Sequence, residues 1–502
     1  MTPLFHNEDC TNFFHSHELA TVDGGAAIDA YVDLVADAGV TAFLCNTNAA
    51  RVNYASNAWE PYWAGLQAPA AGISQSANNH HSPAAQNQMS LNMLALHQQG
   101  IDYPARVLNR CRERGLSAWI SLRMNDVHSQ DMPDHPRHST FWRQNPHLRR
   151  QGYEGYYSRA LDYEHAEVRD HYMRLIDETL DRFDIDGLEL DFLREPYLFS
   201  RGREAHGQVI LTDWIAQVRQ RVRVAQQRRG HRIQLGVRVP SRPDVAMAFG
   251  LDAVTWARRQ LVDLITVGPR WATLEYDMPL TDWRLRLADT AVTLLGGLDV
   301  LIRPFRSANQ RGVRPDEALG AAAQVMHQGA QGIYLFNYFP NGSATGDASW
   351  WSPQTYLATL QAMTSSTTLF QQPRRHVVTF NDVKSPDGNE GWGSGHPQLP
   401  AEGQAIALTL PTGPQPADHW QAELALQFAA PPQATPAVTV NGLPLNMIAP
   451  AADPPANHGR WVIPVAALRE DTNQITIRAA DDQCLTVVWT DITLIPPKRK
   501  VQ

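Results

Sequence analysis

The stretch that most constrains the fold is residues 184–196, which read Asp-Ile-Asp-Gly-Leu-Glu-Leu-Asp-Phe-Leu-Arg-Glu-Pro. Large apolar side chains alternate here with Glu189 and Asp191, so an extended chain places the two carboxylates together on one face. Helical patterns precede and follow the stretch, as in a parallel sheet whose outer face is covered by helices. If that sheet closes into a barrel, the carboxylates point into its interior, where a charge is costly unless it is paired or used. The stretch therefore predicts a strand with chemistry at its end.

Seven further apolar runs that read as strands recur along the chain, with helical patterns between them. The eight strands are expected at residues 4–7, 41–46, 118–123, 184–196, 233–239, 262–267, within 292–302, and at 332–337. Eight strand-helix units are the count of a (β/α)8 barrel. Two segments with little periodicity, 47–100 and 124–163, are expected as long loops, and loops of this length are usually functional or disordered.

The pattern changes near residue 373, where short alternating strands and Pro/Gly turns replace the helices. Strands are expected at residues 406–410, 438–440, 475–477 and 486–488, with a hairpin turn at Asn441-Gly442. The predicted fold class is therefore α/β: a TIM barrel catalytic domain at 1–372, followed by an all-β, jelly-roll-like sandwich at 373–502.

Composition and charge exclude several classes of protein. The 502 residues carry a formal net charge of -8 with one short basic run at 498–500, so nucleic acid is not an expected partner. No stretch reaches the roughly 18 apolar residues of a membrane span. The amino terminus lacks signal-peptide features, so the expected location is the cytoplasm, or the periplasm or exterior if a signal peptide was removed. The cysteines and histidines show no metal-ligand spacing, so neither metal nor cofactor is expected, and the oligomeric state stays open.

In barrel enzymes the active site lies at the carboxyl ends of the strands. The sequence places there a set of side chains that we expect to bind substrate: His6, Asn7, Asn46, Arg123, Asn125, Asp126, His128, Arg238, Trp271 and Asn337. Arginines, amides and aromatic rings together suit a polyhydroxylated ligand, because they supply paired hydrogen bonds and flat surfaces for sugar faces. A phosphate ligand would more often bring a glycine-rich loop, which the sequence lacks.

Cleavage of a glycosidic bond needs two carboxyl groups, one of them an acid and the other a nucleophile or base. Asp191, the last inward residue of strand four, is the candidate nucleophile or base. The acid stays open: Asp277 or Glu275 could reach the site from the loop after strand six, and Glu195 could point either way. Glu189, one layer deeper, is also a catalytic candidate.

For Glu189 a structural role is the favoured interpretation. Buried charges are normally paired. We therefore expect Glu189 to form an ion pair with a barrel arginine such as Arg123 or Arg238.

The motif Asp184-x-Asp186-Gly187-Leu188-x-x-Asp191-x-x-Arg194-x-Pro196 resembles the strand-four signature of the family-10-like glycosyl hydrolases, a group of TIM-barrel proteins. Residues 123–128, 162–163, 167–169 and 334–337 resemble other motifs of bacterial members, and the similarity covers roughly residues 1–370. The resemblance implies a sugar-active barrel. A looser likeness to α-amylase and α-galactosidase barrels implies an aspartate nucleophile after strand four and, in the latter, an acid after strand six. The chitinase-like pattern is broken because Leu193 occupies its acid position.

Three functions follow as hypotheses. The first is a glycoside hydrolase that cleaves an oligo- or polysaccharide by a two-carboxylate mechanism. The second is a polysaccharide lyase, in which arginines bind a uronate and His128 or a tyrosine is the base. The third is a non-catalytic glycan-binding protein, which would release no product from any glycan.

Overall fold

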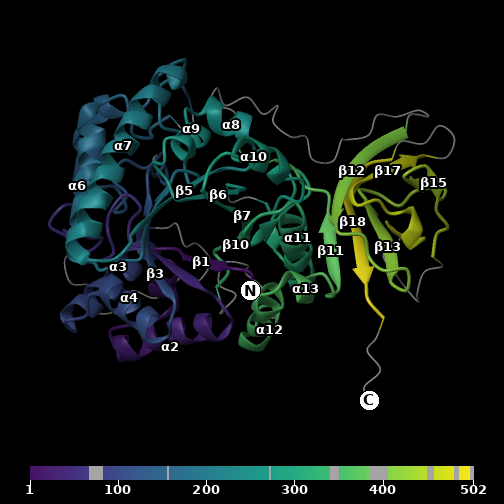
Figure 1. Ribbon diagram of the computed structural model, residues 1–502, viewed down its shortest axis with the longest axis horizontal. Helices are drawn as coiled ribbons and strands as arrows, with labels where there is room; N and C mark the ends of the chain where they lie inside the picture. Colours follow the sequence, from purple (N-terminus) through teal and green to yellow (C-terminus); the bar gives the residue numbers. More distant parts are fainter. Residues whose placement is uncertain are drawn as a thin grey trace.

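The computed structural model describes most of the chain: residues 1–66, 83–129, 131–154, 158–270, 273–339, 350–381, 383, 405–448, 457–479 and 485–497. A barrel with its helices forms one part, and two packed β-sheets form the other (Figure 1). Within the described ranges no helix is long and apolar enough to cross a membrane.

Eight parallel strands close the barrel in the order β1-β10-β7-β6-β5-β4-β3-β2. They are β1 (Leu4–Glu8), β2 (Ala42–Asn46), β3 (Ser117–Arg123), β4 (Gly187–Asp191), β5 (Gln234–Pro240), β6 (Leu264–Gly268), β7 (Thr293–Asp299) and β10 (Gly332–Phe336). Each overlaps the segment that the sequence predicts. The TIM barrel is therefore confirmed.

Strand β7 carries the weakest sequence signal because Gly296 and Gly297 lie within it. The structure explains the first of these glycines: a Cβ at Gly296 would lie 1.8 Å from Cγ1 of Val325 in the covering helix. The absent side chain lets that helix approach the sheet.

Helices surround the barrel, and several begin at a residue whose side chain caps the first turn. They are α1 (Asn12–Ser16), α2 (Gly24–Asp37), α3 (Pro83–Gln98), α4 (Tyr103–Glu113), α5 (Thr140–Gln144), α6 (Ala166–Arg182), α7 (Glu204–Arg229), α8 (Pro243–Ala248), α9 (Ala253–Arg258), α10 (Leu280–Arg286), α11 (Pro315–His327), α12 (Pro353–Met363) and α13 (Ser366–Leu369). Asp23 and Asp102, for example, accept hydrogen bonds from Ala26 and Ala105 at the starts of α2 and α4. A hairpin of β8 (Leu301–Ile302) and β9 (Arg311–Gly312) follows β7.

The two segments predicted as long loops contain helices. Helix α3 lies in 47–100, and α5 lies in 124–163. Met89, Met93 and Leu96 of α3 are buried at spacings of four and three, which is one helical face. The segment 47–100 thus ends in a helix, whose apolar face the sequence analysis did not identify.

Alternate residues of the barrel strands point inward, and their chemistry changes along the barrel. The lower interior is apolar, formed around Trp119, Leu264 and Leu295. Farther toward the carboxyl ends the same strands present Glu189, then Asp191, both buried. This change from apolar to charged side chains positions the candidate site.

The carboxyl-terminal part is a β-sandwich of two four-stranded sheets, in the orders β11-β18-β13-β16 and β12-β17-β14-β15, as predicted in kind. The strands are β11 (Arg374–Val377), β12 (Ala405–Gly413), β13 (Gln421–Phe428), β14 (Ala437–Val440), β15 (Leu443–Pro444), β16 (His458–Ile463), β17 (Asp471–Arg478) and β18 (Val487–Ile495). Asn441 and Gly442 join β14 to β15 with φ of 52° and 85°, the positive angles that a two-residue hairpin turn of this type requires.

Helix α11 packs against β11 and β12 as well as against the barrel (Figure 1). Residues 317–325 are all buried, and five of these nine are alanine or glycine. A Cβ at Gly320 would lie 2.0 Å from the carbonyl oxygen of Arg375, so only glycine permits this approach. The side chain of Gln324 accepts a bond from the N–H of Gly413 at 2.6 Å. The helix therefore belongs to the cores of both parts.

Candidate active site at the carboxyl end of the barrel

Asp191 ends β4 and lies in register between Arg123 of β3 and Arg238 of β5. The Arg238 guanidinium donates two bonds to its carboxylate, to Oδ1 at 2.9 Å and to Oδ2 at 3.0 Å. The backbone N–H groups of Leu193 and Arg194 also donate to Oδ1, at 3.0 and 3.1 Å. All four contacts are donors, so Asp191 binds them as a carboxylate. Donors from three residues, Arg238, Leu193 and Arg194, therefore fix the orientation of the Asp191 carboxylate.

Glu189 lies one layer below Asp191 and is fully buried. Its Oε1 accepts hydrogen bonds from the hydroxyls of Ser121, at 2.7 Å, and Tyr334, at 2.8 Å, with the Asn7 amide 3.5 Å away. Its Oε2 has no hydrogen-bond partner among the described residues. Burial, with the nearby Asp191 carboxylate, raises the pKa of Glu189 to about 7. Glu189 therefore holds a proton through mildly acidic pH.

Arg123 pairs with a carboxylate in the loop that follows β1. One of its NH2 nitrogens donates to Oδ2 of Asp9, just beyond β1, at 2.6 Å. Burial acts to raise the pKa of Asp9, but the Arg123 guanidinium outweighs it and holds that pKa well below its usual range. With Arg123 on Asp9 and Arg238 on Asp191, no ion pair joins either arginine to Glu189 within the described part of the chain, so that expectation was wrong.

Above this layer, Asp126, His128 and Arg194 form a chain of contacts. Asp126 Oδ2 lies 3.1 Å from Nδ1 of His128, and an Arg194 nitrogen donates to Nε2 of the same ring at 2.6 Å. Arginine has no acceptor, so Nε2 must accept and Nδ1 must carry the proton. Burial lowers the pKa of His128 to about 3, which agrees with a neutral ring. The lone pair of this imidazole is thus already engaged.

Glu195 follows Arg194 and is fully buried beside Asp191's loop. Its Oε2 accepts from Arg270 at 2.7 Å, whereas its Oε1 has no hydrogen-bond partner among the described residues. Burial raises the pKa of Glu195 above its ordinary value, although Arg270 and Arg194 act in the opposite direction. This carboxyl therefore keeps its proton to higher pH than a free glutamate.

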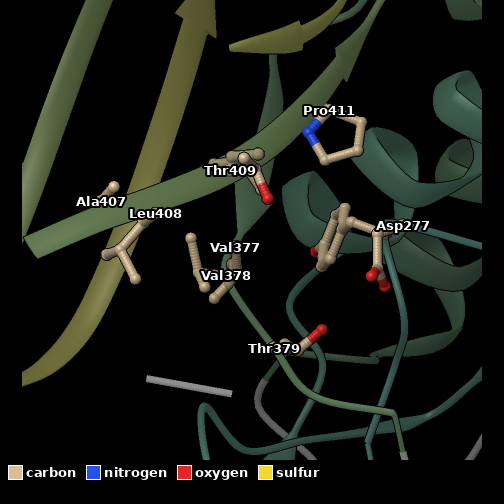
Figure 2. Close-up of a pocket in the computed structure, with 10 residues that line it drawn as sticks. Asp277, Val377, Val378, Thr379, Ala407, Leu408, Thr409 and Pro411 are labelled. Carbon is tan, nitrogen blue, oxygen red and sulfur yellow. The ribbon is translucent and has the colours of Figure 1, made fainter. Parts of the chain in front are cut away.

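The two acids predicted from the loop after β6 separate in the structure. Glu275 is buried and accepts from the Ser241 hydroxyl at 2.6 Å. Asp277 is about half exposed and accepts from Arg242 at 2.7 Å. It lines a pocket against the sandwich (Figure 2), to which Asp191 does not contribute. Among the described residues, the hydrogen-bond partners of Asp191 do not include Asp277.

His6 also lies away from these residues. Its ring contacts the hydroxyls of Tyr31 in α2, at 3.2 Å, and Tyr356 in α12, at 3.5 Å. It packs on Phe43 of β2 with ring centroids 5.2 Å apart. Inward and outward residues alternate along β1, so His6 faces the helices while Asn7 faces the barrel interior. His6 therefore supports the packing of helices on the barrel.

Among the predicted amides, Asn46 and Asn125 are used within the protein. Asn46 accepts from the N–H of Cys10 and donates to the carbonyl of Ser121. Asn125 donates to the carbonyls of Leu161 and Tyr197. Both amides therefore bind backbone groups of the protein and help to fix the loops that begin at the strand ends.

Asn337 follows β10 with φ of 61°, and its buried Oδ1 has no partner among the described residues. Trp271 lies outside the described residues.

The sequence interpretation missed Ser121, Tyr334 and Arg270. Ser121 lies two residues before Arg123 on a predicted strand, so strict alternation would have placed it in the interior, whereas alternation from Asn337 selects Leu335 and not Tyr334. Arg270 lies two residues beyond β6 and carries no comparable signal. Within the described ranges no cluster of three His, Cys, Asp or Glu side chains could hold a metal ion.

No family model matches the chain, and no curated protein matches it. Among solved structures it is similar to a family GH18 chitinase from Chromobacterium violaceum, with 12% identity, a TM-score of 0.35, and 99% of this chain and 88% of that chain covered. The PgaB (BpsB) glycoside hydrolase domain from Bordetella bronchiseptica matches with 10% identity and a TM-score of 0.40 over 73% and 98% of the two chains. The catalytic domain of GH30 xylanase C from Talaromyces cellulolyticus matches with 11% identity and a TM-score of 0.36 over 96% and 98%. Similarity at this level carries no argument about the reaction, which has to be inferred from the side chains of the barrel mouth.

Proposed function

We propose that this protein is a glycoside hydrolase in which Asp191 is the nucleophile or base and Glu195 is the acid. The observation that carries the proposal is the difference between the two carboxyl groups. Asp191 is held by a guanidinium and two backbone N–H groups, whereas Glu195 is buried, has a raised pKa, and has one oxygen that accepts no hydrogen bond from the described residues and lies 4.0 Å from an Arg194 nitrogen. Two carboxyls in contrasting environments are what acid and base roles require.

The contacts of Asp191 assign its reactive atom. Oδ1 accepts three bonds, from Arg238, Leu193 and Arg194, whereas Oδ2 accepts one, from Arg238. A carboxylate oxygen has two lone-pair directions, so Oδ2 retains one for chemistry. Arg238 and the backbone thus orient Oδ2 without saturating it.

In the proposed reaction, Glu195 gives its proton to the leaving glycosidic oxygen as the bond to the anomeric carbon breaks. Oδ2 of Asp191 then bonds to that carbon, or takes a proton from the water that does. In the first route, water then displaces Asp191 from the anomeric carbon and gives a proton back to Glu195; in the second, the proton on Asp191 returns to Glu195 through solvent, so that either route adds one water across the bond. Glu189 lies one layer below Asp191, where Ser121 and Tyr334 bind it.

The lyase alternative is less well supported by the contacts. A lyase needs an unengaged base to remove a proton beside the uronate, and His128 was the candidate. Its Nε2 accepts from Arg194 and its Nδ1 faces Asp126. Tyr334 donates to Glu189, and burial raises the pKa of this tyrosine well above its usual value. The hydrolase proposal also agrees with the resemblance of residues 184–196 to family-10-like glycosyl hydrolases.

The test is a screen of defined oligosaccharides with product analysis, run on the wild type and on Asp191→Asn. We expect reducing sugar from at least one substrate and a loss of about a thousandfold or more in the variant, with folding unchanged. Unsaturated products that absorb in the ultraviolet would favour the lyase instead.

Asp263→Asn is a matched control. Asp263 also pairs with an arginine, Arg219 at 2.6 Å, and accepts a backbone N–H, but it precedes β6 at the opposite end of the barrel. Its loss should lower stability and leave turnover intact. A fully active Asp191→Asn enzyme would overturn the mechanism.

A further inference from the structure

A pocket of about 330 Å³ lies where the barrel meets the sandwich. Its walls come from three places: Tyr276 and Asp277 after β6, residues 377–379 at the end of β11, and residues 407–411 of β12. None of these described residues belongs to the proposed active site. The volume lies within the range of small-molecule sites.

The side chains at this pocket are mainly hydrogen-bonding groups. Figure 2 shows the hydroxyls of Thr379 and Thr409 and the carboxylate of Asp277 directed toward the same space from three elements. Asp277 Oδ2 accepts from Arg242 at 2.7 Å. Its Oδ1 accepts no bond from the described residues, and about half of the side chain is exposed.

Backbone groups add to this set. β11 and β12 are edge strands of their two sheets, and they lie next to each other. The outer N–H and C=O groups of an edge strand are not paired within its sheet. They supply donors and acceptors beside the hydroxyls, while Val378, Leu408 and Pro411 supply apolar contacts.

The charge of the pocket narrows the class of ligand. The Asp277 carboxylate and the Arg242 guanidinium form an ion pair, so this pair offers neither an anion nor a cation an unbalanced opposite charge. A neutral ligand with several hydroxyl groups can donate to the Asp277 carboxylate and exchange hydrogen bonds with the threonine hydroxyls. Its C–H groups can pack on the apolar side chains of the pocket.

We propose that this junction pocket is a second carbohydrate site, which binds a neutral sugar ring without cleaving it. Asp277 Oδ1 accepts hydrogen bonds from sugar hydroxyls, and Thr379 and Thr409 donate to or accept from others. The inference goes beyond the proposed hydrolysis, because binding here needs neither Asp191 nor Glu195.

The test is calorimetric titration with five separate probes: D-glucose, D-galactose, D-mannose, L-fucose and N-acetyl-D-glucosamine, each up to about 50 mM. The titrations use the Asp191→Asn protein, so that binding is measured without turnover and is judged separately from the hydrolase proposal. At least one sugar should bind, and the added change Asp277→Asn should weaken that binding at least tenfold.

Asp282→Asn is the matched control, because Asp282 is similarly exposed and pairs with Arg286 at 2.9 Å on α10, outside the pocket. It should leave the affinity unchanged. Thr409→Val gives a second variant on a different element and should also weaken binding. The proposal is overturned if none of the five sugars binds, or if Asp277→Asn and Thr409→Val bind as the parent does.

Discussion

The guanidinium of Arg238 lies between the Asp191 carboxylate, which it binds with bonds of 2.9 and 3.0 Å, and the ring of Phe336, whose centroid is 4.1 Å away. The planar group stacks on the ring while its edge meets both carboxylate oxygens. Lysine has the same charge but neither the flat face nor the fork. Arg238 therefore fixes the direction of Asp191 as well as its charge.

Arg238→Lys is expected to lower kcat by about 10- to 100-fold with a smaller change in KM, because a misdirected Oδ2 affects the reaction more than binding. Steady-state kinetics on a substrate from the oligosaccharide screen measure this. Arg219→Lys, at the amino end of the barrel, is the control and should leave kcat unchanged. Equal rates for Arg238→Lys and the wild type would show that Asp191 is not the reactive group.

Glu195→Gln should distinguish the acid from a merely structural carboxyl. Without a proton donor, substrates with poor leaving groups should lose about 10²- to 10⁴-fold in kcat, whereas aryl glycosides with good leaving groups should lose far less. The alkaline limb of the wild-type profile should lie above the ordinary glutamate pKa, because the pKa of Glu195 is raised. Equal losses on both classes of substrate would contradict the acid role.

Glu189 should make stability depend on pH. Its folded-state pKa of about 7 lies above the reference value of 4.5, so the folded protein binds the proton more tightly than the unfolded chain. The stabilisation is fully present below about pH 4.5 and is lost as the pH rises through 7, on the order of 3 kcal/mol in all. Urea unfolding at pH 5 and pH 8 should show that Glu189→Gln reduces this loss. An unchanged pH dependence in the variant would mean that Glu189 is not the titrating group.

Gly320→Ala should be strongly destabilising. The new Cβ would lie 2.0 Å from a backbone carbonyl of β11, which cannot rotate away as a side chain would. We expect a loss of several kcal/mol in the free energy of unfolding, measured in urea. Gly25→Ala in α2 is the control, since its Cβ would meet nothing closer than 3.3 Å, and alanine favours a helix by up to ~1 kcal/mol.

The barrel was predictable because each strand is a short run in which apolar residues either occupy every position or alternate with polar residues. The position of Asp191 followed from the same alternation. The sequence did not predict which carboxylate pairs with which arginine. Asp191 has an arginine beside it on each neighbouring strand, and the sequence does not say that Arg238 takes it while Arg123 turns to Asp9.

Side chains on irregular loops were the least predictable part of the candidate site. Period-two reasoning fixes the direction of a strand residue but not of Glu195 or Asp277, which lie beyond strand ends. Their surroundings depend on elements far along the chain: Arg270 for Glu195, and β12 for the pocket that holds Asp277. Such contacts are set by the closed three-dimensional arrangement.

Because α11 packs against both the barrel and the sandwich, the two parts constrain each other's evolution. A different carboxyl-terminal domain would need a backbone segment that packs as closely on Gly320 as Arg375 does. It would also need an N–H group that donates to the side chain of Gln324, as Gly413 does. Recombination with an unrelated tail would therefore fail unless α11 changed with it. Barrel and sandwich should consequently be inherited together, melt in a single calorimetric transition, and resist being expressed apart.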